Sequence, residues 1–125
     1  MTTLDGRYPY QAPIDAYGNG GFRFADMSHR GSLLCLPSGM LAWHVSDPLA
    51  LDVADFDAVL AAPEGIGFLL LGTGARQLMP PPDLRAAFAT AGIGLEPMST
   101  GAAARTYNVL LAERRPVAAA LLVVP

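Results

Sequence analysis

Two glycine-bearing segments hold the residue types best suited to binding an anion. One segment, Gly72-Thr-Gly-Ala-Arg76, follows an apolar run, and the other, Ser99-Thr-Gly101, follows a second short apolar segment. Glycine lets a ligand approach the backbone, hydroxyl groups donate hydrogen bonds and arginine supplies a positive charge. Where parallel strands end and helices begin, free backbone amides also favour an anion. The predicted pocket comprises Gly72, Thr73, Gly74, Arg76, Ser99, Thr100, Arg105 and Asn108.

A purely structural interpretation of these residues stays open, because turns and helix caps also use glycine and hydroxyl residues. Arg105 and Asn108 lie on one side of a predicted helix, where they could hydrogen-bond a partner or a small anion. Arg105 could equally pair with Glu96 or Glu113 inside the molecule. The segments do not form a phosphate loop of the G-x-x-x-x-G-K-[ST] type, since the chain contains no Lys.

The two histidines predict no metal site by themselves. His29 and His44 flank a predicted strand, and a metal would still need a carboxylate such as Asp26 or Asp47. His44 is more simply a strand residue at the edge of a sheet. We therefore expect neither a metal nor a cofactor.

The single cysteine, Cys35, is predicted to be a packing residue. It alternates with Leu34 and Leu36, so its side chain faces the opposite side of a strand. Free cysteine usually behaves as a small buried hydrophobic residue, and nothing beside Cys35 would lower its pKa. The sequence also lacks the spacing of a catalytic triad or a glycosidase carboxylate pair. Whether a reaction is catalysed stays open, and a non-catalytic role is favoured.

Composition limits the class of protein. The 125 residues are 52% hydrophobic and 15% charged, which predicts one soluble domain with a sizeable core. All eight basic residues are Arg and the net charge is −3, so we expect no binding to nucleic acid. No apolar run reaches the roughly 18 residues of a membrane span, and the N-terminus lacks a secretory pattern. We expect a cytoplasmic, bacterial protein; the sequence leaves its oligomeric state open.

The first part of the chain is predicted to be β structure. Residues 1–13 read as an extended N-terminal arm that lies over the body through Tyr8 and Tyr10. Segments 21–25, 32–36 and 40–45 read as three strands of an antiparallel meander, because each is apolar or alternating and bounded by turn residues. Residues 14–125 are expected to form a single α/β domain.

The pattern then alternates between strands and helices. Apolar spacing predicts a short helix after Asp52, a second after three prolines and ending at Gly92, and a third from Ser99 through Arg114. Continuous apolar runs at 66–71 and 117–124 predict strands covered on both faces, and 93–98 is a shorter strand. The order β-α-β-α-β predicts a layered α/β sandwich with a mixed central sheet, extended or covered by the meander.

Three segments resemble a family of small domains of unknown function. The most specific is the block Arg105-Thr-Tyr-Asn108 with its upstream residues Glu96, Met98 and Thr100. Two further segments resemble the same family in order and spacing: Ile14-Asp-Ala-Tyr17-Gly-Asn-Gly-Gly-Phe22 and Leu69-Leu-Leu-Gly-Thr-Gly74. The family includes mitochondrial NADH dehydrogenase complex I assembly factor three and stand-alone bacterial and archaeal relatives. The resemblance implies an α/β fold with a mixed central sheet and no defined chemistry.

Two hypotheses about function follow. The first is a non-catalytic interaction or assembly-factor-like protein that binds another protein and, by resemblance, is linked to respiratory complex I biogenesis. The second is a small-molecule or anion-binding protein, or a weak enzyme, that uses the loops at 72–74 and 99–100. The first predicts an exposed apolar patch, and the second predicts free hydrogen-bond donors at the two loops.

Overall fold

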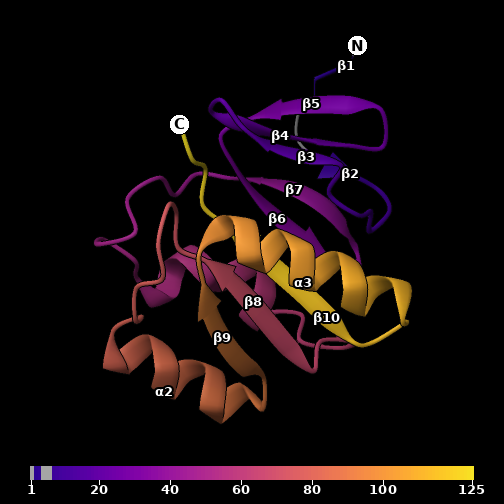
Figure 1. Ribbon diagram of the computed structural model, residues 1–125. Coiled ribbons are helices and arrows are strands. Elements are labelled where there is room, and N and C mark those ends of the chain that lie inside the picture. Colours follow the sequence, from indigo (N-terminus) through magenta and orange to yellow (C-terminus); the bar gives the residue numbers. More distant parts are fainter. Residues whose placement is uncertain (1, 4–6) are drawn as a thin grey trace.

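The computed structural model describes residues 2–3 and 7–125, which form two sheets and the helices around them (Figure 1). The strands of the larger sheet are β2 (Arg7–Tyr8), β6 (Ser32–Leu36), β7 (Gly39–Trp43), β8 (Phe68–Gly72), β9 (Gly94–Met98) and β10 (Val117–Leu121). Those of the smaller sheet are β1 (Thr2–Thr3), β3 (Ala16–Gly18), β4 (Gly21–Phe24) and β5 (Met27–Arg30). The helical segments are η1 (Val53–Phe56), α1 (Asp57–Leu60), α2 (Pro82–Ala91) and α3 (Thr100–Ala112).

The larger sheet is mixed, with the strand order β2-β7-β6-β10-β8-β9. Strands β10, β8 and β9 are parallel, while β6 is antiparallel to β10 and β7 is antiparallel to β6. The β6-β7 hairpin therefore extends the sheet formed by the β-α-β-α-β half. The predicted α/β fold with a mixed central sheet is confirmed.

Two hydrophobic cores lie on opposite faces of this sheet. On one face Leu34, Leu71 and Ala120 pack with Phe56 of η1 and Phe88 of α2. On the other face the alternate strand residues pack with α3 and the smaller sheet; they include Leu33, Cys35, Leu70, Ala119 and Leu121. Side chains alternate between the two faces along a strand, and a core covers each face. Every residue of β6 and β10 is therefore buried. The sequence prediction that Cys35 faces away from Leu34 and Leu36 is correct.

Local signals define the helix ends. Asp52 caps η1 in a capping box with Asp55, and Gly92 ends α2 with a φ of 73°. Ser99 is the N-cap of α3, and its side chain accepts a hydrogen bond from the amide of Ala102. The third helix ends at Ala112 rather than at Arg114, because Arg114 has a φ of 60°, which is outside the helical range.

The N-terminal meander differs in detail from the predicted pairing. The segment 21–25 pairs not with 32–36 but with β3 and β5, so the three consecutive strands of the smaller sheet are β3, β4 and β5. Strand β5 was not predicted, since its sequence Met27-Ser-His-Arg30 is largely polar. The turn before it uses Ala25 and Asp26 with φ values of 49° and 62°, and it has no glycine to mark it.

The N-terminal segment continues into the core on the α3 side. The Tyr8 ring lies edge-on against Phe24, with ring centroids 5.9 Å apart. Ala12 and Ile14 are buried, and the Gln11 side chain donates a hydrogen bond to the carbonyl oxygen of Val117. The described part of the predicted arm thus contacts both the smaller sheet and the start of β10.

Candidate functional site

The two predicted loops meet where β8 and β9 end. The amide of Thr73 donates to the carbonyl oxygen of Met98, and the amide of Thr100 donates to that of Gly74, each at 2.8 Å. Gly72 permits this approach, because a Cβ atom on it would lie 2.9 Å from Cα of Thr100. Sequence reasoning therefore placed residues 72–74 and 99–100 side by side correctly.

The hydroxyl groups at this edge are engaged inside the protein. The Thr73 hydroxyl lies 2.7 Å from the carbonyl oxygen of Arg76 and accepts a hydrogen bond from the amide of Leu78. The Thr100 hydroxyl donates to Leu122 O at 2.7 Å and accepts from the Gly74 amide at 3.0 Å. Both threonines are buried, and the Ser99 hydroxyl caps α3. These bonds stabilise the junction and occupy the hydroxyl donors of Thr73 and Thr100, which a ligand would use.

Asn108 holds the chain just before β3. Its side-chain oxygen accepts from the amide of Ile14, and its side-chain nitrogen donates to the carbonyl oxygen of Ile14, both at 2.8 Å. The neighbouring Tyr107 hydroxyl donates to the carbonyl oxygen of Ala12 at 2.8 Å. The block 105–108 therefore joins α3 to residues 12–14, a contact between segments about ninety positions apart in the chain.

Arg105 is exposed and faces a cleft between α3 and β3. Among residues 7–125 it forms no salt bridge, so the pairing with Glu96 or Glu113 that the sequence allowed is not formed there. Its Nη1 lies 3.4 Å from the position that a Cβ on Gly101 would occupy. The cleft has a volume of about 330 Å³. Its lining residues are Ile14, Asp15, Ala16, Tyr17, Ala104, Arg105 and Asn108.

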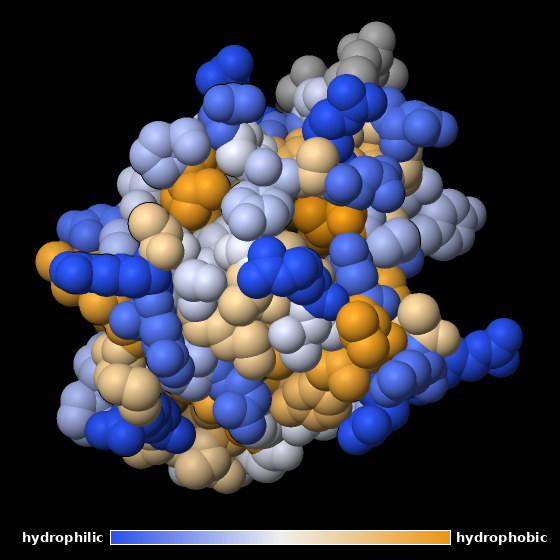
Figure 2. Space-filling model, in the orientation of Figure 1, coloured by the Kyte–Doolittle hydropathy of each residue, from blue (hydrophilic) through white to orange (hydrophobic). Residues whose placement is uncertain are grey.

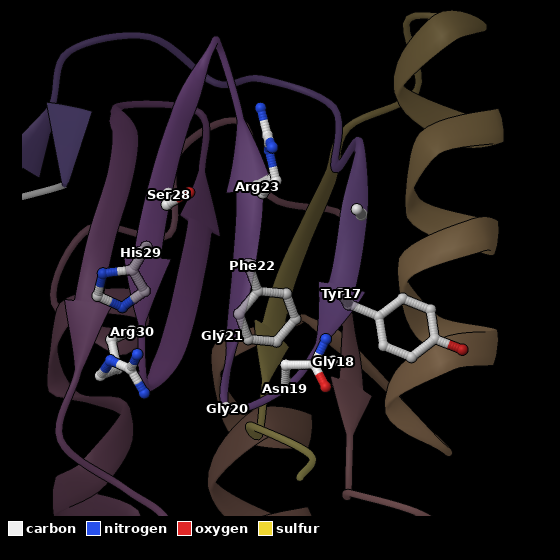
Figure 3. Close-up of a pocket in the computed structure, with 11 residues that line it drawn as sticks. Tyr17, Gly18, Asn19, Gly20, Gly21, Phe22, Arg23, Ser28, His29 and Arg30 are labelled. Atoms are coloured by element: carbon white, nitrogen blue, oxygen red, sulfur yellow. The ribbon is translucent and has the colours of Figure 1, made fainter. Parts of the chain in front are cut away.

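Tyr17 is one of the residues of this cleft that are absent from the pocket predicted from the sequence. Its ring extends from β3 toward α3 (Figure 3), and its hydroxyl occupies the space that a Cβ on Gly101 would need. A tyrosine before a glycine-rich turn carries no local sign of contact with a helix some 85 residues later, so only the fold reveals it. Arg76, the other predicted cation, is exposed in the loop after β8 and does not line the cleft.

A second hollow, of about 360 Å³, lies on the smaller sheet. Gly18 and Gly21 face each other across β3 and β4, and Arg23 and Arg30 are exposed nearby. The two arginine side chains extend toward opposite ends of the hollow (Figure 3). They do not converge on one point, in contrast to Tyr17 and Arg105.

The remaining candidate groups lie apart from these clefts or in the core. The His29 ring donates from Nε2 to the carbonyl oxygen of Ser32, and Nε2 of His44 lies 2.9 Å from Oδ1 of Asp55. Within the described residues, no three His, Cys, Asp or Glu side chains are placed to hold a metal ion. Burial raises the pKa of the Cys35 thiol and of the Tyr107 hydroxyl well above their usual values. Both groups are thus neutral at physiological pH.

The family model for a protein of unknown function (DUF498/DUF598) matches residues 14–122. An uncharacterized protein of Rhodobacter capsulatus is 43% identical over 113 residues, which cover 90% of this chain and 86% of the relative. NADH dehydrogenase [ubiquinone] 1 alpha subcomplex assembly factor 3 of Mus musculus is 26% identical over 125 residues, which cover all of this chain and 68% of the relative.

The fold is also found in solved structures. A crystal structure described as an outer membrane protein from Bartonella henselae superposes with a TM-score of 0.91 and 52% identity, covering 94% of this chain and 99% of the other. In the described part of the present chain, no helix is long and apolar enough to cross a membrane. The fold of this chain is therefore shared with a protein described as an outer membrane protein.

Proposed function

The chain belongs to the DUF498/DUF598 family of proteins of unknown function, and from this membership we propose that it is a non-catalytic, assembly-factor-like protein that binds another protein. The more specific part of the proposal is a role in the biogenesis of respiratory complex I. Support comes from the mouse relative named as an assembly factor, whose similarity extends over all 125 residues of this chain. The similarity thus includes all of the residues that the structure describes.

The observation that carries the proposal is that the hydroxyl and amide side chains of the predicted pocket form hydrogen bonds within the protein. Thr73, Ser99 and Thr100 all bind backbone groups of the protein itself, and Asn108 binds Ile14. A small-molecule site at the end of β8 would have to break these bonds, which leaves buried polar groups unpaired at a cost of about 1–3 kcal/mol each. This edge is better suited to positioning α3 than to holding a substrate.

The surface offers apolar side chains to a protein partner. Figure 2 shows hydrophobic residues as separate patches among hydrophilic ones on the face that includes α3. Large exposed side chains include Val109 on α3 and Tyr10 in the N-terminal segment, which are 57% and 69% exposed. Small apolar patches within a polar surround are typical of interfaces that form and dissociate.

The proposal is tested in the organism that encodes the protein. Its gene is deleted, and assembled complex I is measured in membranes by native gel electrophoresis and by NADH oxidation. We expect less assembled complex in the deletion strain and full recovery when the wild-type gene is returned. Recovery should be equally complete with Cys35→Ala, because Cys35 is buried and has no proposed role in binding.

Two outcomes would count against the proposal. An unchanged amount of assembled complex in the deletion strain would remove the link to complex I. If the tagged chain also elutes from extracts and solubilised membranes at the size of the isolated protein, with no second protein at stoichiometric amount, the interaction role itself is wrong.

A further inference from the structure

We propose that the cleft between β3 and α3 binds an oxyanion, the chemistry shared by carboxylate and phosphate groups, through the guanidinium of Arg105 and the hydroxyl of Tyr17. This site differs from the loop edge at 72–74 and 99–100, and it does not depend on the proposed role in assembly. Two residues of the sequence-predicted pocket, Arg105 and Asn108, line this cleft, and Tyr17 is added as a donor.

Arg105 has an unpaired positive charge in this cleft. Its side chain turns toward Gly101, and no carboxylate among residues 7–125 lies within salt-bridge distance of it. Arginine presents several N–H donors in a planar arrangement that matches two oxygens of a carboxylate or phosphate. An oxyanion that enters the cleft from solvent can replace the water around this exposed guanidinium and accept hydrogen bonds from it.

Tyr17 supplies a second donor at the same point. Its hydroxyl has no hydrogen-bond partner within residues 7–125, and the residue is 43% exposed. The hydroxyl and Nη1 of Arg105 both lie within 3.4 Å of one position, that of a Cβ on Gly101. Two donors from separate elements, β3 and α3, therefore lie beside each other at the wall of the cleft.

The backbone around these donors is built to keep them in place. Gly101 is buried, and a Cβ there would collide with the Tyr17 hydroxyl, so only glycine admits the ring at this position. The wall of the cleft is fixed by the two hydrogen bonds between Asn108 and Ile14. A site whose donors are already in position loses less entropy when a ligand binds.

Asp15 also lines the cleft, and it makes the site selective. Its carboxylate repels a second negative charge, so an anion of low charge is favoured over a highly charged one. Replacing Asp15 with Asn removes this repulsion while keeping the shape of the side chain. Asp15→Asn should therefore tighten anion binding, whereas loss of Arg105 should weaken it.

The test measures binding of sodium phosphate and sodium acetate at constant ionic strength, by NMR shift titration of backbone amides. In the wild type we expect saturable shifts around residues 15–17 and 101–105. Arg105→Gln should weaken binding roughly tenfold or more, and Tyr17→Phe, which removes only the hydroxyl, should weaken it several-fold. The matched control is Arg76→Gln, an exposed arginine outside the cleft, which should change the affinity by less than about twofold.

The two anions distinguish the source of the oxyanion. Tighter binding of phosphate indicates a phosphate-bearing ligand, and tighter binding of acetate indicates a carboxylate. Shifts that do not saturate with either anion, or identical affinity in wild type and Arg105→Gln, would overturn the proposal. Unchanged thermal unfolding of Tyr17→Phe and Arg105→Gln confirms that the comparison is made between folded proteins.

Discussion

Arg105 and Asn108 belong to one turn of α3, yet their side chains have different roles. Asn108 satisfies both backbone groups of Ile14, so it is committed to holding the chain before β3. Arg105 is exposed and forms no salt bridge with any residue in 7–125. At the scale of single residues, the hydrogen bonds formed inside the protein decide which polar side chains are left to bind something else.

Substituting Asn108 tests its structural role. Asn108→Ala removes two hydrogen bonds of 2.8 Å and leaves the amide and carbonyl of Ile14 without these partners. We expect the free energy of unfolding to fall by about 1–3 kcal/mol in urea denaturation. Thr106→Ala, in the same helix and with no such bond in the described residues, should stay within about 0.5 kcal/mol of the wild type. Equal stability of the two variants would contradict the assignment.

The buried Cys35 thiol and Tyr107 hydroxyl predict loss of stability in alkali. Burial raises the pKa of both groups in the folded state, so the unfolded chain releases these protons first as the pH rises. The contribution of these two groups to stability should be constant below about pH 8 and fall at higher pH. The usual pKa is roughly 8.5 for the thiol and roughly 10 for the hydroxyl. Above that pKa, each group should lower the free energy of unfolding by about 1.4 kcal/mol per pH unit.

The variant Cys35→Ala separates the effect of the thiol on the pH dependence of stability from the effect of the Tyr107 hydroxyl. This variant should be less stable at neutral pH, and its stability should begin to fall only near the usual tyrosine pKa of roughly 10. Denaturant unfolding from pH 7 to 11 measures both curves. The interpretation is wrong if wild type and variant lose stability over the same pH interval, or if the folded variant no longer functions in complex assembly.

At the scale of elements, strands buried on both faces determine the organisation of the molecule. In β10, Ala118 and Ala120 contact the core with α2, while Val117, Ala119 and Leu121 contact the core with α3. Small side chains let helices on both faces approach this strand closely. β10 is an interior strand, bonded to β6 on one side and to β8 on the other.

Leu121→Asp should abolish folding. The substitution places a carboxylate at a fully buried position inside a hydrophobic cluster, and an unpaired buried charge costs several kcal/mol of a total stability of about 5–15 kcal/mol. We expect insoluble protein, or a chain without a cooperative thermal transition. Leu49→Asp, at a side chain that is 83% exposed, is the matched control and should fold normally. A cooperative transition in Leu121→Asp would contradict the interior position of β10.

At the scale of the whole molecule, the N-terminal segment completes the core beside α3. Ala12 is buried and its carbonyl oxygen accepts the hydrogen bond of Tyr107, while Gln11 bonds to Val117 at the start of β10. These contacts link the first residues of the described chain to its last helix and strand.

Removal of residues 1–13 should therefore destabilise the domain. The truncated chain loses the carbonyl partner of Tyr107 and exposes apolar surface around Phe24, so its unfolding midpoint in urea should fall. Tyr107→Phe in the full chain removes only the hydrogen bond and should account for part of the loss. If the truncated chain is as stable as the full one, the segment is an independent arm and the interpretation fails.

Local sequence patterns determined most elements of the fold. Caps at Asp52 and Ser99, the glycine after α2 and the apolar runs of β8 and β10 act over a few residues, so they can be read directly from the chain. The convergence of the loops at residues 72–74 and 99–100 also followed, because parallel strands must end at one edge of a sheet.

Only the tertiary structure decided which distant residues meet. Residues 21–24 pair within the smaller sheet. The side chains of Thr73, Thr100 and Asn108 bind backbone groups. Tyr17 lies against Gly101 and near Arg105. The physical reason is that a hydroxyl or amide side chain has the same local preferences whether its partner is a ligand or a carbonyl some ninety residues away. Packing of the whole chain determines that partner. It therefore also determines which groups remain free to bind a ligand.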